Sequence, residues 1–199
     1  MGHRVTANTV MLALVVLLPP ALVAQTPLTT FGCDSATLKS PDGRHVLSWQ
    51  STPKGCNGYH ALLLLDANGP HKRVLLHDDV PLAVSWSPDS SHFFVDDHHS
   101  SDFDSTYVFS ADGSRVDLFK SMERAPDRFA RGLHAGHVYL IGLHWIDSDH
   151  ILIELTGHFD QPPATQFKAC YVADVLGGVT RLQAQETRLN QDCASAPIR

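Results

Sequence analysis

The stretch from Trp86 to Phe119 is a repeating unit, and its repetition constrains the fold more than any other feature of the sequence. It reads W-S-P-D-S-S-H-F-F-V-D-D-H-H-S-S-D-F-D-S-T-Y-V-F-S-A-D-G-S-R-V-D-L-F. Pro presets the backbone φ of a turn, Asp bonds to its own backbone, and Gly accepts a positive φ. The apolar and aromatic runs between these turn residues are typical of β-strands. We therefore predict four short antiparallel strands in this unit.

Weaker copies of the unit precede and follow it, so that the units cover about 34–77, 82–120 and 138–183. The first unit repeats the turn as Ser40-Pro41-Asp42-Gly43. In the third unit Trp145 occupies the place of Trp86, but the proline of the turn is missing. Self-similarity at roughly 40–50 residues, with four strands per repeat, is typical of propeller blades. We predict an all-β fold built from three four-stranded antiparallel units.

Three segments fall outside these units. Residues 25–32 form a lead-in without a clear period, and residues 184–199 form a polar tail that we expect to be extended. The insertion 121–137 separates the second unit from the third. It contains at most one short helix from about Pro126, since Pro is tolerated in a first helical turn and Gly132 stops the helix.

The motif W-S-P-D-S-S-H-F-F-V…S-T-Y-V-F-S-A-D-G-S-R-V resembles the WD-like β-propeller repeat of TolB-type periplasmic proteins. It also resembles the non-catalytic propeller of prolyl-oligopeptidase-type enzymes, and the resemblance covers most of residues 34–183. It implies blade architecture and argues against catalysis, because those enzymes carry their catalytic residues in a separate domain. Closed propellers have about four to eight blades. With three units, we expect a partial propeller or a layered sandwich with covered ends, or closure by a homodimer.

The first 24 residues have the features of a secretory signal peptide. Arg4 supplies a short positive start, Val10–Leu18 is an apolar run of nine residues, and small residues follow at Ala21 and Ala24. Nine apolar residues are too few to cross a bilayer as a helix. We predict cleavage after Ala24 and a single domain over 25–199 in the periplasm or outside the cell. A retained membrane anchor is the alternative interpretation.

All four cysteines follow this segment, at Cys33, Cys56, Cys170 and Cys193. An even number of cysteines in an exported chain favours two disulfides over free thiols. We favour Cys33–Cys56 with Cys170–Cys193, because each pair then closes a loop within one unit. The chief alternative joins Cys33 to Cys193 and ties together the two ends of the domain.

Composition and motifs point to binding rather than catalysis. The sequence contains no G-x-S-x-G, H-E-x-x-H, P-loop or G-x-G-x-x-G motif, and we expect no cofactor. Its net charge of −6 opposes binding to nucleic acid or to an anionic membrane, since it repels phosphates. We expect a non-catalytic protein that binds another envelope or secreted protein through the loops at 51–58, 97–105 and 157–166.

The loop of the second unit holds the densest group of carboxylates and imidazoles, in a chain with 13 histidines. The residues that we predict to bind a partner are Asp97, His98, His99, Asp102, Asp104 and His158. These groups also suit zinc, manganese or iron. A competing interpretation is a metal-binding protein or metal-dependent enzyme that uses Asp96, His98, His99, Asp102 and His158.

The spacing of these residues limits the metal interpretation. Successive residues in a strand point to opposite faces, so Asp96 to His99 converge only where the strand has ended. Exposed inter-strand loops commonly have this Asp, Ser and His composition. A solvated loop is therefore the simpler interpretation of the segment.

Overall fold

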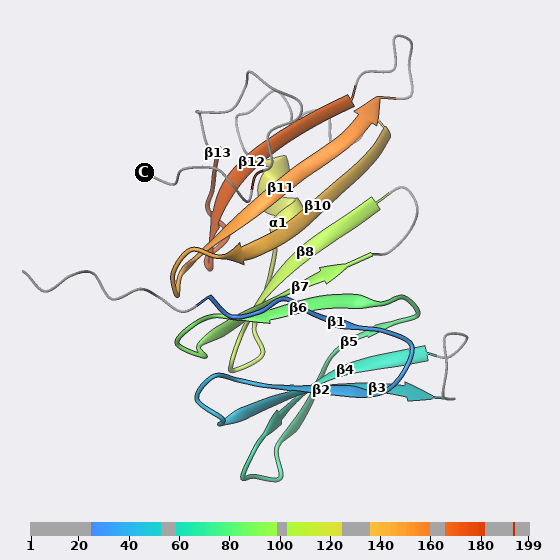
Figure 1. Ribbon diagram of the computed structural model, residues 1–199, viewed down its shortest axis with the longest axis vertical. Coiled ribbons are helices and arrows are strands. Elements are labelled where there is room, and N and C mark those ends of the chain that lie inside the picture. Colours follow the sequence, from blue (N-terminus) through green and yellow to red (C-terminus); the bar gives the residue numbers. More distant parts are fainter. Residues whose placement is uncertain are drawn as a thin grey trace, which may run out of the picture.

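A computed structural model of the 199-residue chain describes residues 25–52, 59–98, 103–124, 136–159, 166–181 and 193. The predicted signal peptide, the predicted helix start at Pro126 and nearly all of the tail lie outside these residues. Within them the chain forms thirteen strands and one short helix (Figure 1). No helix in this described part is long and apolar enough to cross a membrane.

Three antiparallel four-stranded meanders follow one another along the chain. The first sheet consists of β2 (Ala36–Lys39), β3 (His45–Thr52), β4 (Tyr59–Asp66) and β5 (Lys72–Asp78). The second sheet consists of β6 (Leu82–Trp86), β7 (His92–Asp97), β8 (Phe103–Ser110) and β9 (Arg115–Asp117). The third sheet consists of β10 (Gly136–Trp145), β11 (His150–Phe159), β12 (Gln166–Asp174) and β13 (Val179–Arg181). The predicted β-rich, antiparallel fold is confirmed, and each predicted unit contains one of these sheets.

Two further pairings extend this arrangement. The strand β1 (Thr29–Phe31) lies antiparallel to β6, with Phe31 opposite Leu82. The strand β10 runs parallel to the start of β8, where Val138 lies opposite Phe103, so the second and third sheets are continuous. Sequence analysis assigned no strand to the lead-in, because three residues are too few to show a period of two.

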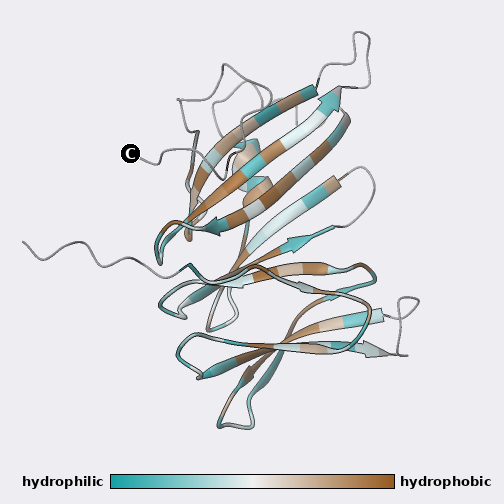
Figure 2. Ribbon diagram, in the orientation of Figure 1, coloured by the Kyte–Doolittle hydropathy of each residue, from teal (hydrophilic) through white to brown (hydrophobic). Residues whose placement is uncertain are grey.

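The second sheet lies between the other two and buries both of its faces. Phe93 and Val95 belong to a core shared with the first sheet, whereas Phe94 belongs to a core shared with the third. Neighbouring side chains on a strand alternate in direction, so the run Phe93–Val95 contributes to both cores. Hydrophobic residues accordingly recur along the strands of all three sheets (Figure 2).

The predicted β-turns between the first two strands of the first and second sheets are present. The N–H of Gly43 donates to the Ser40 carbonyl at 2.9 Å, and Gly43 has a φ of 72°. In the second sheet, Ser90 occupies the equivalent position with a φ of 68°. Its Oγ accepts the N–H of Asp42 at 3.0 Å, and this bond ties the two turns together.

A helix that the sequence did not predict, α1 (Leu118–Glu123), follows β9. Asp117 caps it, because its side chain accepts the N–H of Lys120 at 3.2 Å. The helix buries Leu118, Phe119 and Met122 in the core that the second and third sheets share. The prediction that the second unit stays extended to about residue 120 is therefore wrong, since a capping residue and three apolar side chains favour the helix.

A disulfide joins Cys170 of β12 to Cys193, with a Cα–Cα distance of 5.6 Å. This is the pairing that the sequence favoured, and it rules out the alternative between Cys33 and Cys193. Cys33 is also disulfide-bonded. Its predicted partner, Cys56, lies outside the described residues.

Candidate functional site

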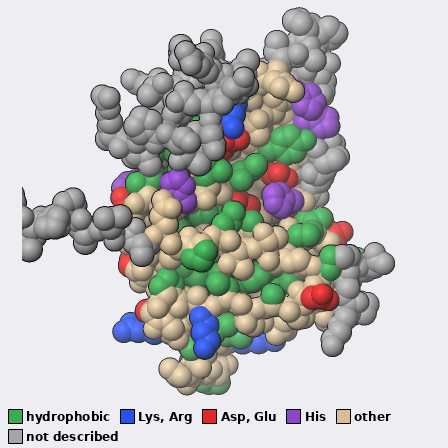
Figure 3. Space-filling model, viewed as in Figure 1, with side chains coloured by type: hydrophobic (Ala, Val, Ile, Leu, Met, Phe, Trp, Pro, Cys, Tyr) green, Lys and Arg blue, Asp and Glu red, His purple; other side chains and the backbone are tan. Residues whose placement is uncertain are grey.

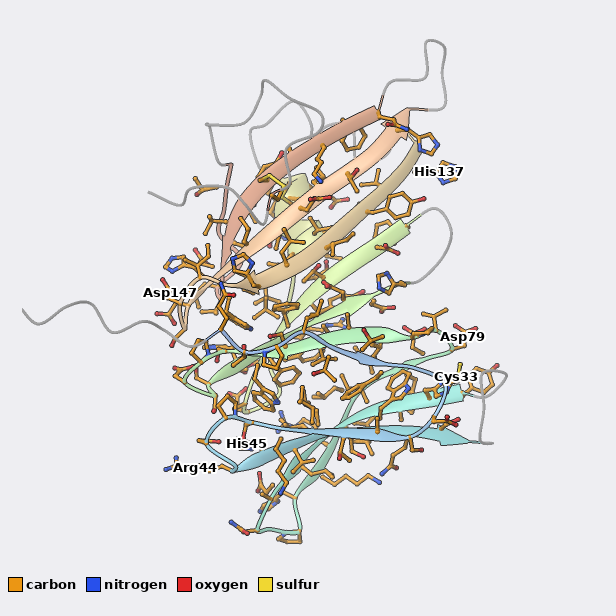
Figure 4. The ribbon with its side chains drawn as sticks, viewed as in Figure 1. Cys33, Arg44, His45, Asp79, His137 and Asp147 are labelled. Atoms are coloured by element: carbon orange, nitrogen blue, oxygen red, sulfur yellow. A yellow bond between two sulfur atoms is a disulfide. The ribbon has the colours of Figure 1, made fainter. Side chains whose placement is uncertain are left out.

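The second and third strands of all three sheets meet at one edge of the molecule. The ends of β3, β7 and β11 and the starts of β4, β8 and β12 all lie on the right in Figure 1. We call this side the loop edge, because the three predicted binding loops leave from it. Cys33, Asp79 and His137 lie along it, whereas Arg44, His45 and Asp147 lie at the opposite side, which we call the turn edge (Figure 4).

The predicted binding loop of the second sheet is only partly described, since His99 and Asp102 lie outside the described residues. Its carboxylates are buried rather than solvated: Asp96 is 1 % exposed, Asp97 is 2 % exposed and Asp104 is 8 % exposed. The interpretation as a solvated loop is therefore wrong for these three residues. The strands β7 and β8 extend as far as these residues, so the neighbouring sheets pack over the three side chains.

Asp96 faces the third sheet. Its Oδ1 accepts hydrogen bonds from Thr106 Oγ1 at 2.6 Å and from the N–H of Gly142 at 2.8 Å. A Cβ at Gly142 would lie 2.8 Å from the ring of Phe94 and 3.1 Å from Asp96 Oδ1. The close approach of β10 to Asp96 thus requires glycine at this position.

Asp97 faces the first sheet, because it follows Asp96 on the same strand. Its carboxyl group is hydrogen-bonded to Asp78, at the end of β5. Asp78 Oδ1 also accepts the backbone N–H groups of Asp79 at 2.7 Å and Val80 at 3.2 Å. Two carboxyl groups can share such a bond only when one of them carries a proton. The pair therefore links the first two sheets in a singly protonated form.

Burial changes the acidity of both aspartates. It raises the pKa of Asp96 to about 7, although the bonds from Thr106 and Gly142 oppose the shift. Burial, followed by the hydrogen bond to Asp78, raises the pKa of Asp97 to about 8. Near neutral pH these groups are therefore substantially protonated. Because Asp96 and Asp97 are buried between packed sheets, their role here is structural: they hold the neighbouring sheets together.

The two histidines of the predicted site that the structure describes, His98 and His158, belong to separate side-chain pairs. His98 Nδ1 lies 3.1 Å from a carboxylate oxygen of Asp104, its cross-strand neighbour. His158 stacks on His137, with ring centroids 4.4 Å apart and an interplanar angle of 18°. Among the described residues, no group of three or more His, Cys, Asp or Glu side chains could hold a metal ion.

The described surface of the loop edge carries an exposed tyrosine, imidazoles and the exposed carboxylate of Asp79. Tyr59, the first residue of β4, is 79 % exposed, and the His98 side chain is 43 % exposed. Histidine side chains lie on the right-hand side of the molecule in Figure 3, and others lie on the left. A hollow of about 340 Å³ opens beside them on the third sheet, and its lining includes Tyr139, Thr156, His158, Gln166 and Lys168.

Sequence reasoning missed four residues that shape this region. Asp78 and Asp79 are adjacent aspartates, as are Asp96 and Asp97, although the two pairs lie at the ends of non-equivalent strands, β5 and β7. The shared Asp-Asp sequence was a usable signal. Tyr59, His137 and Gly142 show no such signal, because their roles depend on which strands come together in space.

Comparisons with protein-family models, with curated proteins and with solved structures found no match. The resemblance to propeller repeats therefore stays a prediction.

Proposed function

We propose that this chain is an exported, non-catalytic binding protein that recognises another envelope or secreted protein through its loop edge. The observation that carries the proposal is the exposed Tyr59, which lies on the same edge as the His98 and His137–His158 imidazoles. Tyrosine is enriched at protein interfaces, because its ring buries a large apolar area while its hydroxyl keeps a polar partner. This edge thus combines contact area with hydrogen-bonding groups.

The disulfide supports the export part of the proposal. Cys170 and Cys193 are both buried, and their bond fixes a residue of the tail against β12. Such bonds persist in oxidising compartments such as the periplasm or the extracellular space. Together with the predicted signal peptide, this bond favours an exported protein.

The stacked sheets support the interpretation as three blades of a partial propeller. Each sheet is a four-stranded meander, and the second sheet buries its faces against both neighbours. On β11, the side chain of Glu154 points away from the face that carries the buried Ile153 and Leu155. It forms an ion pair with Lys168 at 2.8 Å. Leu152 on the same face is fully buried, and Cys170, opposite Glu154, holds the buried Cys193 there, so the chain itself helps to cover this face of a terminal repeat. A monomeric mass in solution would exclude closure by a homodimer.

A pull-down with matched variants tests the proposal. The oxidised protein, purified after export of the full chain, is immobilised and exposed to envelope extract. Tyr59→Ala combined with His158→Ala alters the loop edge. Leu176→Ala is the control, because Leu176 is 88 % exposed at the far end of β12 from Gln166. We expect a protein that the wild type and the control retain and that the loop-edge variant loses. Equal retention by all three forms would refute the proposal.

A further inference from the structure

A second candidate site lies at the turn edge, between the first and second sheets. It is a pocket of about 470 Å³ whose walls include Pro27, Leu38, Lys39, Pro41, Trp86 and Pro88. Small-molecule sites commonly have volumes of about 300–1,000 Å³, with mainly apolar walls and a few polar groups. This pocket has that size and character, and it is separate from the loop edge.

The walls of the pocket are held in place by bonds between its elements. The N–H of Asp42, next to Pro41, donates to Ser90 Oγ at 3.0 Å, and this bond joins the turns that carry Pro41 and Pro88. Thr26, beside Pro27, donates its hydroxyl to the carbonyl of Trp86. A pocket built in this way requires little ordering when a ligand enters, which favours binding.

The indole of Trp86 differs from those of the other two tryptophans. Trp49 Nε1 donates to the Gly32 carbonyl at 2.7 Å, and Trp145 Nε1 donates to the Ser85 carbonyl at 3.1 Å. Trp86 is 2 % exposed, yet its Nε1 has no hydrogen-bond partner among the described residues. A buried donor without a partner costs about 1–3 kcal/mol. The ring of Trp86 forms part of the pocket wall, so its N–H signal reports on what enters the pocket.

Lys39 supplies the charge of the pocket. It is the only charged side chain in the described lining, and no carboxylate lies beside it there. Within the described part of the chain, Lys39 takes part in no ion pair. The pocket therefore combines apolar walls with one unpaired cation.

We propose that this pocket binds a small apolar carboxylate. Its aliphatic or aromatic body would lie among the prolines and Leu38, and its carboxylate would pair with Lys39. This site does not depend on the proposed function of the loop edge, since it lies at the opposite side of the sheets.

Nuclear magnetic resonance of the ¹⁵N-labelled, oxidised protein from the full chain tests this proposal. The three tryptophans give three indole N–H signals, and Trp86→Phe identifies the signal of Trp86. The probes are octanoate and, as an uncharged match, 1-octanol. We expect octanoate to shift the Trp86 signal more than those of Trp49 and Trp145, and to bind about tenfold more tightly than 1-octanol.

Two lysine variants separate the charge from the apolar walls. Lys39→Met should reduce the affinity for octanoate about tenfold. The control Lys72→Met, an exposed lysine of β5 outside the pocket, should leave it unchanged. The proposal is overturned if octanoate does not shift the Trp86 signal. It is equally overturned if octanoate and 1-octanol bind with the same affinity, or if both variants behave like the wild type.

Discussion

The carboxylate of Asp96 accepts the backbone N–H of Gly142 at 2.8 Å and so fastens the second sheet to the third. The next residue, Asp97, is hydrogen-bonded to Asp78 and fastens the second sheet to the first. Adjacent strand residues point in opposite directions, so one acidic pair serves both interfaces. The acidic part of the predicted binding loop is therefore structural, whereas the exposed aromatic and imidazole groups remain available to a partner.

Gly142→Ala should destabilise the fold. The added Cβ would lie 2.8 Å from the ring of Phe94, and a packed interior cannot absorb that overlap without movement. We expect a loss of about 1–3 kcal/mol in the free energy of unfolding by urea. Gly32→Ala is the control, since a Cβ there meets no atom within 4 Å. Equal stability of the two variants would contradict the role assigned to Gly142.

The stability of the protein should fall as the pH rises from about 4 to 8. The folded-state pKa of Asp96, about 7, and that of Asp97, about 8, both lie above the ordinary value of 3.8. The folded protein therefore holds protons that the unfolded chain releases, and the stability present below pH 4 is lost as the pH rises through the folded pKa values. The slope is at most about 1.4 kcal/mol per pH unit for each group.

Urea unfolding between pH 5 and pH 8 measures this dependence. The histidines also titrate in this range, so the comparison is between the wild type and Asp96→Asn or Asp97→Asn. We expect each variant to have a shallower decline than the wild type, because asparagine is neutral at every pH. Parallel curves would show that these two groups do not carry the dependence.

Ser90→Ala should destabilise the turn edge more than Ser90→Gly. Both variants lose the hydroxyl that accepts the Asp42 N–H, at a cost of about 1 kcal/mol. Alanine retains a Cβ at a φ of 68°, whereas glycine adopts this conformation without strain. We expect glycine to be the more stable of the two by about 1 kcal/mol in urea unfolding. The opposite order would contradict this explanation.

Removal of the Cys170–Cys193 disulfide should cost about 3 kcal/mol, since it closes a loop with a sequence separation of 23. The paired variant Cys170→Ser with Cys193→Ser leaves the other disulfide intact and can be compared with the wild type by urea unfolding. A cost below about 1 kcal/mol would show that the tail adds little to the third sheet.

The sequence predicted the strands well because turn chemistry and alternation are local. Ser40-Pro41-Asp42-Gly43 and Asp112-Gly113 marked turns that the structure contains, with Gly43 and Gly113 at φ values of 72° and 85°. The sequence did not predict β1, which is three residues long and is held by pairing with β6. It also did not predict α1, because Asp117 read equally well as the end of a strand.

The candidate site was harder to predict, because it depends on contacts between sheets. The direction of Asp96 and Asp97 followed from strand alternation, but their burial did not. Nothing local indicates that Gly142 approaches Asp96, since their strands β10 and β7 are distant in the sequence. His137 and His158 are cross-strand neighbours on the consecutive strands β10 and β11, but the sequence placed His137 in the insertion rather than in a strand.

Photo-crosslinking in the exporting cell tests the central claim most directly. A photo-reactive phenylalanine analogue replaces Tyr59 on the loop edge in one protein and Leu176, outside that edge, in a second; both positions are highly exposed. We predict a discrete adduct with an envelope or secreted protein from position 59 and none from position 176. An adduct from position 176 alone, or no adduct from position 59, would contradict the assignment of the loop edge as the binding surface.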